Sequence, residues 1–400
     1  MTSSDRLRIV VLGYVVRGPV AGMAWSMLHH LLGLKALGHE VWFLEDSDDY
    51  PSCVDPVRGT IGTDPSLGLA FAGELFERVG LGDRWAYHDA HTGTWHGGAA
   101  GAIRRVCAEA DCVLNLAGVN PLRPWLESVE HRVLVDHDPV FTQIRHLYDP
   151  AAARRAEQHT AFFTLAENFG RVGTTVPDDG FAWQPTRLPI WLEGWPVTPP
   201  PRERRFTTGM QWESYPAREP DGARYGTKAD SFEPYVDLPA RVSPLLELVV
   251  SGPNAPRERL RARGWNTRDP LDAVPDPWVY REYVQRSAAE FTVAKHGYVV
   301  TNSGWFSERS AGYLASGRPV VCEETGFSEW LPPGDGVVSF SSADEAVAGI
   351  EDVSSRYGAH AEAARNLAEI FFDSRRVLAS LLERTFAPAP VAREPQRVAP

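Results

Sequence analysis

The stretch TNSGWFSERSAGYLASGRPVVCEETG, residues 301–326, carries the clearest structural pattern in the chain. The apolar run before it predicts a buried strand that ends at Thr301. The small residues Asn302–Gly304 predict a turn into a helix that starts near Ser307. Ala-Ser-Gly-Arg-Pro-Val-Val then leads into the next strand. Strand–helix–strand units of this kind are typical of parallel, doubly wound sheets, where ligands bind beyond the carboxyl ends of the strands.

The same segment gathers the groups that hold a diphosphate without a metal ion. Backbone N–H groups, hydroxyl groups and an arginine would surround one cavity at the strand ends. The predicted contacts are Ser303, Gly304, Arg309, Ser310, Thr325 and Gly326. Arg309 has an alternative role, because an arginine on a helix is commonly part of a surface ion pair. The surrounding segment favours the phosphate contact.

Strands and helices alternate on both sides of this segment. In the first half, strands are expected at 7–13, 41–46, 112–118, 132–138 and 161–168, with a helix that stops at Gly38. In the second half, strands are expected at 206–212, 245–252, 297–301, 318–326 and 337–340, with a helix over 280–291. Amphipathic helices at 343–353, 359–372 and 374–386 close the chain. Repeated alternation predicts two parallel sheets with right-handed crossovers.

The alternation breaks between residues 174 and 201, where many prolines and several tryptophans occur without a sustained period. We interpret this stretch as the connection between two domains. The first domain then covers residues 1–200 and the second covers 202–375. A closing helix follows at 376–386, and residues 387–400 have the composition of a disordered tail.

Size and composition agree with a folded two-domain protein. The 400 residues exceed what one hydrophobic core usually serves, and 43% are hydrophobic and 23% charged. A net charge of −12 argues against a general binder of nucleic acid or of anionic membranes. No signal peptide and no membrane span are predicted, and the four cysteines are scattered. We therefore expect a cytoplasmic protein.

The glycine-containing turn after the first strand, Gly13–Gly22, carries Arg17 and Gly18. It does not spell the dinucleotide-binding fingerprint or the P-loop motif. Glu45 and Asp46 at the end of the second strand could imitate the ribose-binding carboxylate of a dehydrogenase, which makes a nicotinamide-dependent enzyme the weakest of the alternatives. The plain alternative is that these glycines only shape a turn. Three glycines together with Arg17 favour a ligand site instead.

The strand at 132–138 ends in Asp136, His137 and Asp138, which we predict to face the cleft. An aspartate or histidine there could deprotonate an acceptor hydroxyl or amine. The alternative is a polar strand cap, in which Asp138 accepts backbone N–H bonds ahead of Pro139.

Tryptophans could stack on sugar or acceptor rings, although most tryptophans serve packing first. The candidates are Trp25, Trp183, Trp191 and Trp305. On the first helix, His29 and His30 point to different faces, so one of them could reach the cleft. Together with Arg17 and Gly18, Trp25 and His29 form the predicted acceptor side.

A metal site is not expected. The group His88, Asp89, His91 and His96 lacks the helical spacing of a zinc site. The acidic run Leu44–Tyr50 lacks the glycine and closing glutamate of a calcium loop, so it is expected to be a solvated loop or part of the acceptor rim.

Several stretches resemble glycosyltransferases of the GT-B fold, in which two Rossmann-like domains face each other across a cleft. The A-x-G-x-P-V-V pattern at 315–321 resembles their donor-nucleotide region. The stretches GYVVRGPVAGMAW, FLEDSDDY, VDHDPVFTQ, LAENFG, GFAWQPTRLPIW, EFTVAKHGYV and NSGWFSERSAGYLASGRPVV resemble an actinobacterial group of family-1/family-4-like glycosyltransferases. The resemblance covers nearly the whole chain to about Arg384.

The resemblance implies a site and also departs from the family pattern. Many retaining members carry two glutamates eight positions apart, but glycines Gly304 and Gly312 stand at those positions here. Glu308 lies between them and fits neither role by spacing. Arg309 matches an arginine of related patterns and is carried over as a phosphate contact. Whether the reaction retains or inverts the anomeric configuration stays open.

Two lysines complete the implied donor site. Lys228 lies in the loop after the first strand of the second domain, where GT-B enzymes often place a basic residue on the diphosphate. Lys295 precedes the donor turn. Fixed cations would stabilise the negative charge that builds up on the leaving nucleoside diphosphate. The alternative for each lysine is a solvated surface charge.

The resemblance therefore implies transfer of a sugar from a nucleotide-diphosphate sugar to a small-molecule acceptor, such as a bacterial secondary metabolite. No cofactor and no metal are expected, and a homodimer is possible in principle. The alternatives are a nucleotide-sugar epimerase or hydrolase on the same fold, and a protein that binds nucleotide sugars without catalysis.

Overall fold

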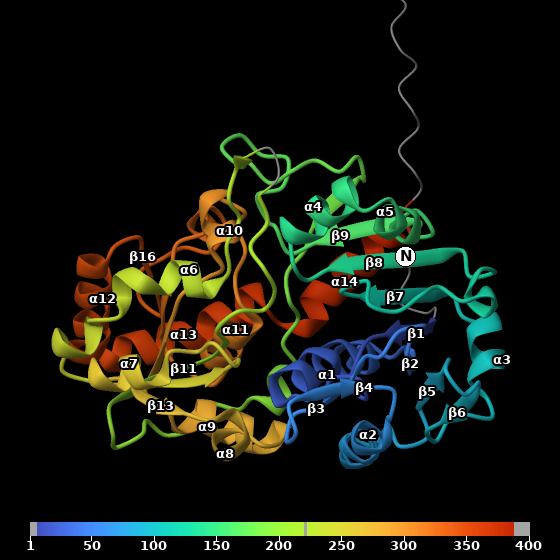
Figure 1. Cartoon of the computed structure of the whole chain (residues 1–400), viewed down its shortest axis with the longest axis horizontal. Coiled ribbons are helices and arrows are strands. Elements are labelled where there is room, and N and C mark those ends of the chain that lie inside the picture. The colour runs from blue at the N-terminus through green and yellow to red at the C-terminus, as the bar shows by residue number, and fades with distance from the viewer. Residues whose placement is uncertain (1–5, 220–221, 388–400) are drawn as a thin grey trace, which may run out of the picture.

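The computed structural model describes residues 6–219 and 222–387. Two α/β halves lie side by side, each built around one mainly parallel sheet with helices on its faces (Figure 1). The tail predicted for residues 387–400 lies, except for residue 387, outside the described part of the chain.

The first sheet has the strand order β10-β9-β8-β7-β1-β2-β5-β6, and its last strand is antiparallel to its neighbour. The strands are β1 (Arg8–Leu12), β2 (Glu40–Asp46), β5 (Trp85–Asp89), β6 (Thr94–His96), β7 (Cys112–Leu116), β8 (His131–Asp136), β9 (Ala161–Thr164) and β10 (Trp183–Pro185). A separate antiparallel hairpin joins β3 (Cys53–Asp55) to β4 (Thr60–Gly62).

The second sheet is wholly parallel and has the strand order β13-β12-β11-β14-β15-β16. Its strands are β11 (Arg205–Gln211), β12 (Leu245–Ser251), β13 (Asn266–Arg268), β14 (Ala289–Thr292), β15 (Val320–Glu323) and β16 (Val337–Phe340). Near-continuous apolar runs such as Leu245–Ser251 suit strands that are covered on both faces.

Helices cover both sheets. Those of the first half are α1 (Ala21–Ala36), α2 (Ser66–Arg78), α3 (Ile103–Ala108), η1 (Pro124–Leu126), α4 (Phe141–Tyr148), α5 (Pro150–Ala156) and η2 (Leu192–Gly194). Those that follow are α6 (Lys228–Phe232), η4 (Glu233–Tyr235), η5 (Leu238–Ala240), α7 (Arg257–Ala262), α8 (Pro270–Ala273), α9 (Pro277–Arg286), α10 (His296–Val300), α11 (Glu308–Ala315), η6 (Phe327–Glu329), α12 (Ala343–Ser355), α13 (Tyr357–Phe371) and α14 (Ser374–Thr385).

Both sheets follow the doubly wound order in which the first strand is central and the chain then reverses direction across the sheet. The reversal lies between β1 and β7 in the first half and between β11 and β14 in the second. Ligands of such sheets bind at this reversal, beyond the carboxyl ends of the strands. The fold therefore places one candidate site in each half.

The chain crosses between the halves twice, and the two crossings are paired. Ile190, on the outward crossing, forms a parallel bridge with Asp373 on the return. Ile190 N donates to Phe372 O at 2.7 Å, and Ser374 N donates to Ile190 O at 2.9 Å. The return crossing leads into α14, which packs on α1 of the first half (Figure 1).

The contact between α1 and α14 requires a glycine. A Cβ at Gly33 of α1 would lie 2.6 Å from Leu378 Cδ1 and 2.7 Å from Ser374 Cβ, closer than real Cβ atoms approach other atoms. Gly33 thus lets the last helix of the chain seal the hydrophobic core of the first half.

Three expectations from the sequence are wrong. Residues 296–300 form the short helix α10, although the run Val299–Val300 reads as a strand; Tyr298 N donates to Lys295 O and closes the helical turn. The helix expected over 280–291 ends at Arg286, and residues 289–292 form the buried strand β14. Glu290 makes this strand hard to recognise, because its charge is paired inside the protein. The strand β10 also lies within the stretch expected to be a connection without regular structure.

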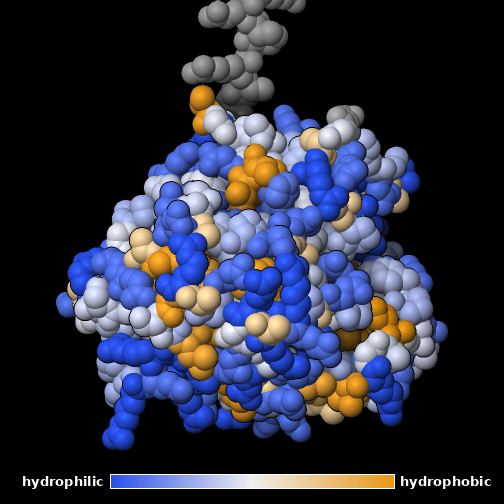
Figure 2. All heavy atoms as spheres, turned by 60° about the vertical axis from the view of Figure 1, so that its left-hand side comes forward, coloured by the Kyte–Doolittle hydropathy of each residue, from blue (hydrophilic) through white to orange (hydrophobic). Residues whose placement is uncertain are grey.

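The outer face of the second half is mainly hydrophilic. In the view of Figure 2, hydrophobic atoms form small separate groups among hydrophilic ones.

Within residues 6–219 and 222–387, no helix combines the length and apolar character needed to cross a bilayer.

We predict that Gly33→Ala destabilises the protein by about 1–3 kcal/mol, because the added methyl group overpacks the α1–α14 contact. Gly73→Ala in α2 is the matched control. Its Cβ meets nothing within 4 Å, so it should leave stability unchanged or raise it by about 0.5–1 kcal/mol through helix propensity. Urea unfolding of both variants checks this. Equal midpoints for the two would contradict the proposed packing role of Gly33.

Candidate active site between the two halves

The site in the second half lies where β11, β14 and β15 end and α11 begins. A cavity of about 10 Å³ there is lined by Thr292, Ser307, Ser310, Glu323 and Thr325, among others. That volume suits about one water molecule. The hydroxyl of Ser310 is buried and has no hydrogen-bond partner within the described residues. A cavity therefore lies at the predicted donor turn, but in this conformation its volume is too small for a diphosphate.

Arg309 projects inward and is not a surface ion-pair residue. It forms an ion pair with Glu290 of β14, which is fully buried, and its Nη2 donates to Thr292 Oγ1 at 2.7 Å. The second carboxylate oxygen of Glu290 has no partner among the described residues. Arg309 thus stands at the strand-end cavity with a counter-ion already in place.

Lys228, at the start of α6, is the unusual charge of the site. Its side chain is buried, and no hydrogen bond or ion pair is found for it within the described residues. Burial lowers the pKa of this lysine well below its usual value, and the neighbouring Arg309 lowers it further. Glu290 and Glu323 oppose that effect. A bound anion would stabilise the ammonium that the protein itself leaves without a counter-ion.

Glu323 ends β15 at the same edge of the sheet. It accepts hydrogen bonds from Ala294 N at 3.0 Å and from the hydroxyl of Tyr235 at 3.3 Å. Burial nevertheless raises the pKa of Glu323 to about 7. Near neutral pH this carboxyl is therefore only partly ionised and only partly compensates the charge of Lys228.

Asp138 and Lys295 meet across the cleft. Lys295 Nζ lies 2.7 Å from Asp138 Oδ1, and the hydroxyl of Tyr215 donates to Asp138 Oδ2 at 2.7 Å. Tyr298 also donates to Asp138. The Lys295 ammonium lies 4.6 Å from the centre of the Tyr215 ring, so it is held by cation–π attraction as well. The acidic group of the first half and a lysine of the second half are thus in direct contact.

The backbone beside Asp138 is strained. Val140, a β-branched residue, has a φ of +72°, a conformation that costs about 1–3 kcal/mol and often marks functional sites. Its N–H donates to Gln143 Oε1 at 2.6 Å, which helps to hold that conformation. The strain fixes the turn that presents Asp138 to the second half.

Asp136 and His137 differ from Asp138 in their surroundings. Asp136 is buried and accepts hydrogen bonds from Thr142 Oγ1 at 2.7 Å and Thr164 Oγ1 at 2.8 Å, so it holds the loop together. His137 stacks on His30, and burial together with His30 lowers the pKa of His137 to about 3. Its Nε2 has no partner within the described residues. A histidine held neutral in this way is a weak base, which leaves Asp138 as the stronger candidate.

Glu308 is a cleft group to which the sequence analysis gave no role. It begins α11 and faces Ser26 of α1 across the boundary between the halves, with Arg309 and Tyr14 nearby. Burial raises the pKa of Glu308 to about 8. Its neighbours come from residues far away in the sequence, so no local pattern could have indicated this environment.

The predicted donor contacts at the turns are partly used by the contact between the halves. Asn168 of the first half donates from Nδ2 to Asn302 O at 3.1 Å and to Gly326 O at 3.0 Å. A Cβ at Gly304 would lie 2.7 Å from the Asn168 side chain, and Gly304 N donates to Thr325 O. The Ser303 hydroxyl donates to Tyr298 O. In this conformation these N–H and hydroxyl groups are not free for a phosphate.

In the first half, the turn after β1 is closed by a carboxylate. Consecutive N–H groups of Val15, Val16 and Arg17 donate to Glu45 at 2.6, 2.8 and 2.7 Å. The Arg17 side chain is buried beside the same carboxylate, while Gly18 is partly exposed. Glu45 thus occupies the place that a phosphate takes at such turns. This arrangement disfavours a dinucleotide site.

The predicted acceptor residues Trp25 and His29 are buried away from any open surface. Trp25 packs edge-on against Trp195 and Trp278, and its indole N–H donates to Pro277 O at 2.6 Å. His29 Nδ1 accepts from Trp191 N at 2.9 Å. Both rings join α1 to the second half and to the connection. Neither has a face available for stacking on an acceptor.

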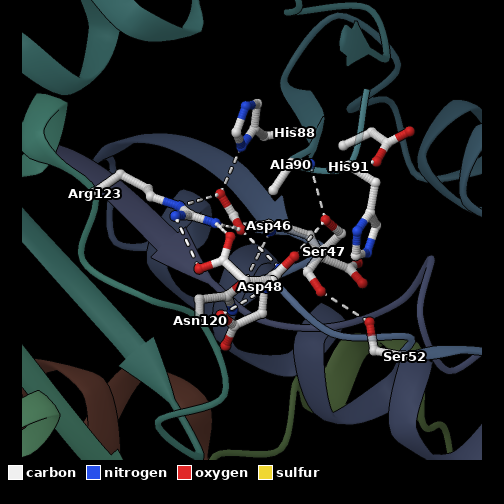
Figure 3. A network of polar contacts seen from close by, with 12 residues as sticks. Asp46, Ser47, Asp48, Ser52, His88, Ala90, His91, Asn120 and Arg123 are labelled. Atoms are coloured by element: carbon white, nitrogen blue, oxygen red, sulfur yellow. Dashed lines mark hydrogen bonds and ion pairs between the residues drawn. The ribbon is translucent and has the colours of Figure 1, made fainter. Parts of the chain in front are cut away.

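The acidic run at 44–50 is not a solvated loop. Asp46, Ser47 and Asp48 are buried, and Figure 3 shows Arg123 and His88 directed at Asp46 from two sides. His88 Nδ1 lies 2.7 Å from Asp46 Oδ2, and the guanidinium of Arg123 lies 2.9 Å from Asp46 Oδ1. Burial alone would raise the pKa of Asp46, but these contacts lower it. The network fixes the carboxyl edge of β2.

The histidine-containing group at 88–96 stabilises the turn between β5 and β6. Asp89 accepts from His91 N at 3.0 Å and from Thr92 Oγ1 at 2.7 Å, and His96 bonds to Thr94. Among the residues that the structure describes, no cluster of histidine, cysteine, aspartate and glutamate could hold a metal ion.

Comparison with solved structures places this fold. An alpha-glucosyltransferase in complex with UDP-glucose and DNA containing an abasic site aligns with a TM-score of 0.58 and 11% identity, over 96% of this chain and 100% of that one. AviGT4, a glycosyltransferase involved in avilamycin A biosynthesis, aligns with a TM-score of 0.54 and 14% identity, over 95% and 97%. Anabaena Alr3699/HepE in complex with UDP-glucose aligns with a TM-score of 0.55 and 11% identity, over 94% of this chain and 99% of that one.

These neighbours are GT-B proteins, and the chain has the GT-B fold of two Rossmann-like halves. The similarity spans both halves and nearly the full length of each neighbour. No protein-family model matches the sequence, and no curated protein matches it significantly.

We predict that His29 makes stability depend on pH. Burial lowers the pKa of His29 to about 3. Between pH 6.5 and 3 the unfolded chain therefore binds a proton that the folded chain does not, and the stability contributed by neutral His29 is lost as the pH falls. His29→Asn keeps an acceptor for Trp191 N but does not titrate. Its stability relative to the parent should rise by about 2 kcal/mol between pH 7 and pH 5.

Urea unfolding of parent and variant at the two pH values measures this difference. His91→Asn, at an exposed histidine, is the control and should leave the pH profile of the parent unchanged. A parent–His29→Asn difference that is the same at both pH values would refute the buried, neutral state of His29.

Proposed function

We propose that this protein is a glycosyltransferase that moves a sugar from a nucleotide-diphosphate sugar to a small-molecule acceptor without a metal ion. Residues 202–375 would bind the donor and residues 1–200 the acceptor. The motif resemblance to an actinobacterial group of glycosyltransferases, and an acceptor of the secondary-metabolite class, are parts of this proposal.

One observation carries the proposal: the buried, unpaired Lys228 at the strand reversal of the second sheet. Arg309 and Lys295 bring further positive charge to the same edge. The chain contains only three lysines, and two of them stand here. A diphosphate supplies the negative charge that this group lacks. The corresponding turn of the first half is filled by Glu45, so the second half is favoured as the donor site.

The structural neighbours support the donor class. Two of those named above were solved with UDP-glucose, and AviGT4 takes part in making a small natural product. The alpha-glucosyltransferase neighbour was solved with DNA, but a net charge of −12 disfavours a nucleic-acid acceptor here.

The residues suggest a course for the reaction. Entry of the donor would draw Lys295 to the diphosphate and release one oxygen of Asp138. Asp138 would take the proton of the acceptor hydroxyl while the acceptor oxygen bonds to the anomeric carbon. The bond from that carbon to the diphosphate breaks, and the nucleoside diphosphate leaves with its charge held by Lys228, Lys295 and Arg309. Movement of the halves about the paired crossings would open and close the site.

A second candidate function is binding of a nucleotide sugar without transfer. Both oxygens of Asp138 are engaged by Lys295, Tyr215 and Tyr298, so the proposed base is not free in this conformation. Binding without turnover would favour this alternative. Release of free sugar without any acceptor would favour a hydrolase.

Lys228→Met tests the donor site. We predict that this change raises the Tm of the unliganded protein by about 2–4 °C, because it removes a buried amino group that has no polar partner within the described residues. The same change should weaken nucleoside diphosphate binding by about 10–100-fold, because a charge-assisted contact is lost. A thermal-shift screen of UDP, GDP, ADP, CMP and dTDP, with and without magnesium, measures both effects.

Arg224→Ala is the control, since Arg224 lies in the same loop but is exposed and paired with Glu219 and Asp230. It should keep the affinity of the parent within about twofold. Unchanged affinity in Lys228→Met, or no nucleotide that binds the parent, would overturn the donor site.

Asp138→Asn tests the base. We predict a fall in sugar transfer of about 10²–10⁴-fold, because the amide cannot take the proton of the acceptor. Nucleotide affinity should change little. The measurement is nucleoside diphosphate release from the donor that the binding screen identifies, with a panel of phenolic and sugar acceptors. Full transfer by the variant would exclude Asp138 as the base.

A further inference from the structure

A second hollow lies between the halves, and of the residues singled out in the sequence analysis only Trp191, a candidate stacking residue, lines it. It has a volume of about 530 Å³ and is formed by α1, α2, the connection around η2, and α9. This volume is within the range of small-molecule sites. We call it the α2–α9 groove and define it by Lys35, Arg78, Trp191, Glu193, Trp278 and Arg281.

Two arginines of the groove share one indole ring and have no counter-ion. The guanidinium carbon of Arg78 lies 4.2 Å from the centre of the Trp278 ring, and that of Arg281 lies 5.5 Å from it. Arg78 makes no hydrogen bond or ion pair within the described residues. Arg281 donates only to a backbone carbonyl, Gly194 O at 2.9 Å, and its Nε has no partner.

The two charges oppose each other. Burial lowers the pKa of Arg281, and the neighbouring Arg78 lowers it further. The chain has 52 acidic and 40 basic residues apart from histidine, yet among the described residues none forms an ion pair with either guanidinium. Glu282 raises the pKa of Arg281 as a nearby charge, but it does not outweigh burial and Arg78. A bound anion would satisfy both guanidiniums at once.

The remaining charges of the groove leave it positive. Glu193 is the acidic group of the lining, and it already forms an ion pair with Arg375. Lys35 Nζ donates to the carbonyl of Gly80 at 3.3 Å, and within the described residues it has no ion-pair partner. Lys35 and Arg78 come from the first half, and Arg281 comes from the second.

The groove also offers flat apolar surfaces. Trp191 and Trp278 are both partly exposed. Trp191 stacks over Gly194, where a Cβ would lie 2.4 Å from its ring, so the glycine keeps the indole in place. Indole faces bind sugar rings and bases by stacking.

We propose that the α2–α9 groove binds a phosphorylated ring compound, with the phosphate on Arg78, Arg281 and Lys35 and the ring on Trp191 or Trp278. The phosphate ester of a sugar and that of a nucleoside share this chemistry. Because the cations come from both halves, the ligand binds the arrangement of the halves that brings α2 and α9 together. This site is separate from the donor site and does not rest on the proposed function.

Isothermal titration of the full-length protein with glucose 6-phosphate, AMP and inorganic phosphate tests the proposal, with tryptophan fluorescence as a second readout. We expect at least one of the two esters to bind more tightly than inorganic phosphate and to change the fluorescence. The ester that binds identifies the source. In Arg78→Ala, binding should weaken at least tenfold; the side chain is exposed, and within the described residues it makes no hydrogen bond or ion pair that the change would break.

Arg104→Ala is the matched control, because Arg104 also lies over an indole, Trp125, at 5.9 Å and is exposed. It should bind like the parent, and so should Lys228→Met. Absence of binding by either ester at millimolar concentration would overturn the proposal. Binding that survives Arg78→Ala but is lost in Lys228→Met would assign the ligand to the donor site and would also overturn it.

Discussion

Positive charge held at the carboxyl edge of the second sheet organises the cleft. Arg309 is balanced by the buried Glu290, and Lys295 forms its ion pair with Asp138 of the first half. Glu323 compensates Lys228 only in part, because burial raises the pKa of that carboxyl to about 7. One contact between opposite charges thus joins the edges of the two sheets, while Lys228 has no ion-pair partner within the described residues.

The two halves share a strand order but use the first turn of that order differently. In the first half, three backbone N–H groups bind Glu45, and the anion site of the fold is filled by the protein itself. In the second half, the loop after β11 leads to Lys228. Within the described residues no carboxylate forms an ion pair with Lys228, although Asp230 accepts from Thr227 N at 2.7 Å. This asymmetry is the reason why the proposal places the nucleotide in the second half.

The sequence predicts those features that depend on neighbouring residues. Alternating strands and helices, the glycine turns and the helix that begins near Ser307 follow from local patterns, and the structure contains them. The strand at Ala289–Thr292 could not be recognised, because its Glu290 is balanced by Arg309, nineteen residues later along the chain. No local pattern indicates the environment of Glu308, because Ser26, which it faces, lies on α1.

Trp25 and His29 illustrate the same limit. A helix-face argument places one of them near the cleft, but their partners Pro277, Trp278 and Trp191 lie more than 160 residues away. Such contacts appear only when the halves are assembled. For Lys228, Arg309 and Asp138 the sequence indicates the position at a strand end, while their binding and catalytic roles stay predictions.

The seal between α1 and α14 has a consequence for how the protein forms. The last helix of the described residues, α14, packs on the first half, and the missing Cβ of Gly33 leaves the space that this contact needs. During synthesis, residues up to β10 emerge long before Leu378 can cover α1. Until Leu378 has emerged, the first half therefore has an uncovered apolar face on α1, and its core is completed only after α14 has been synthesised. In the first half, therefore, residues that are synthesised early cannot complete their packing until residues from the far end of the second half have been made.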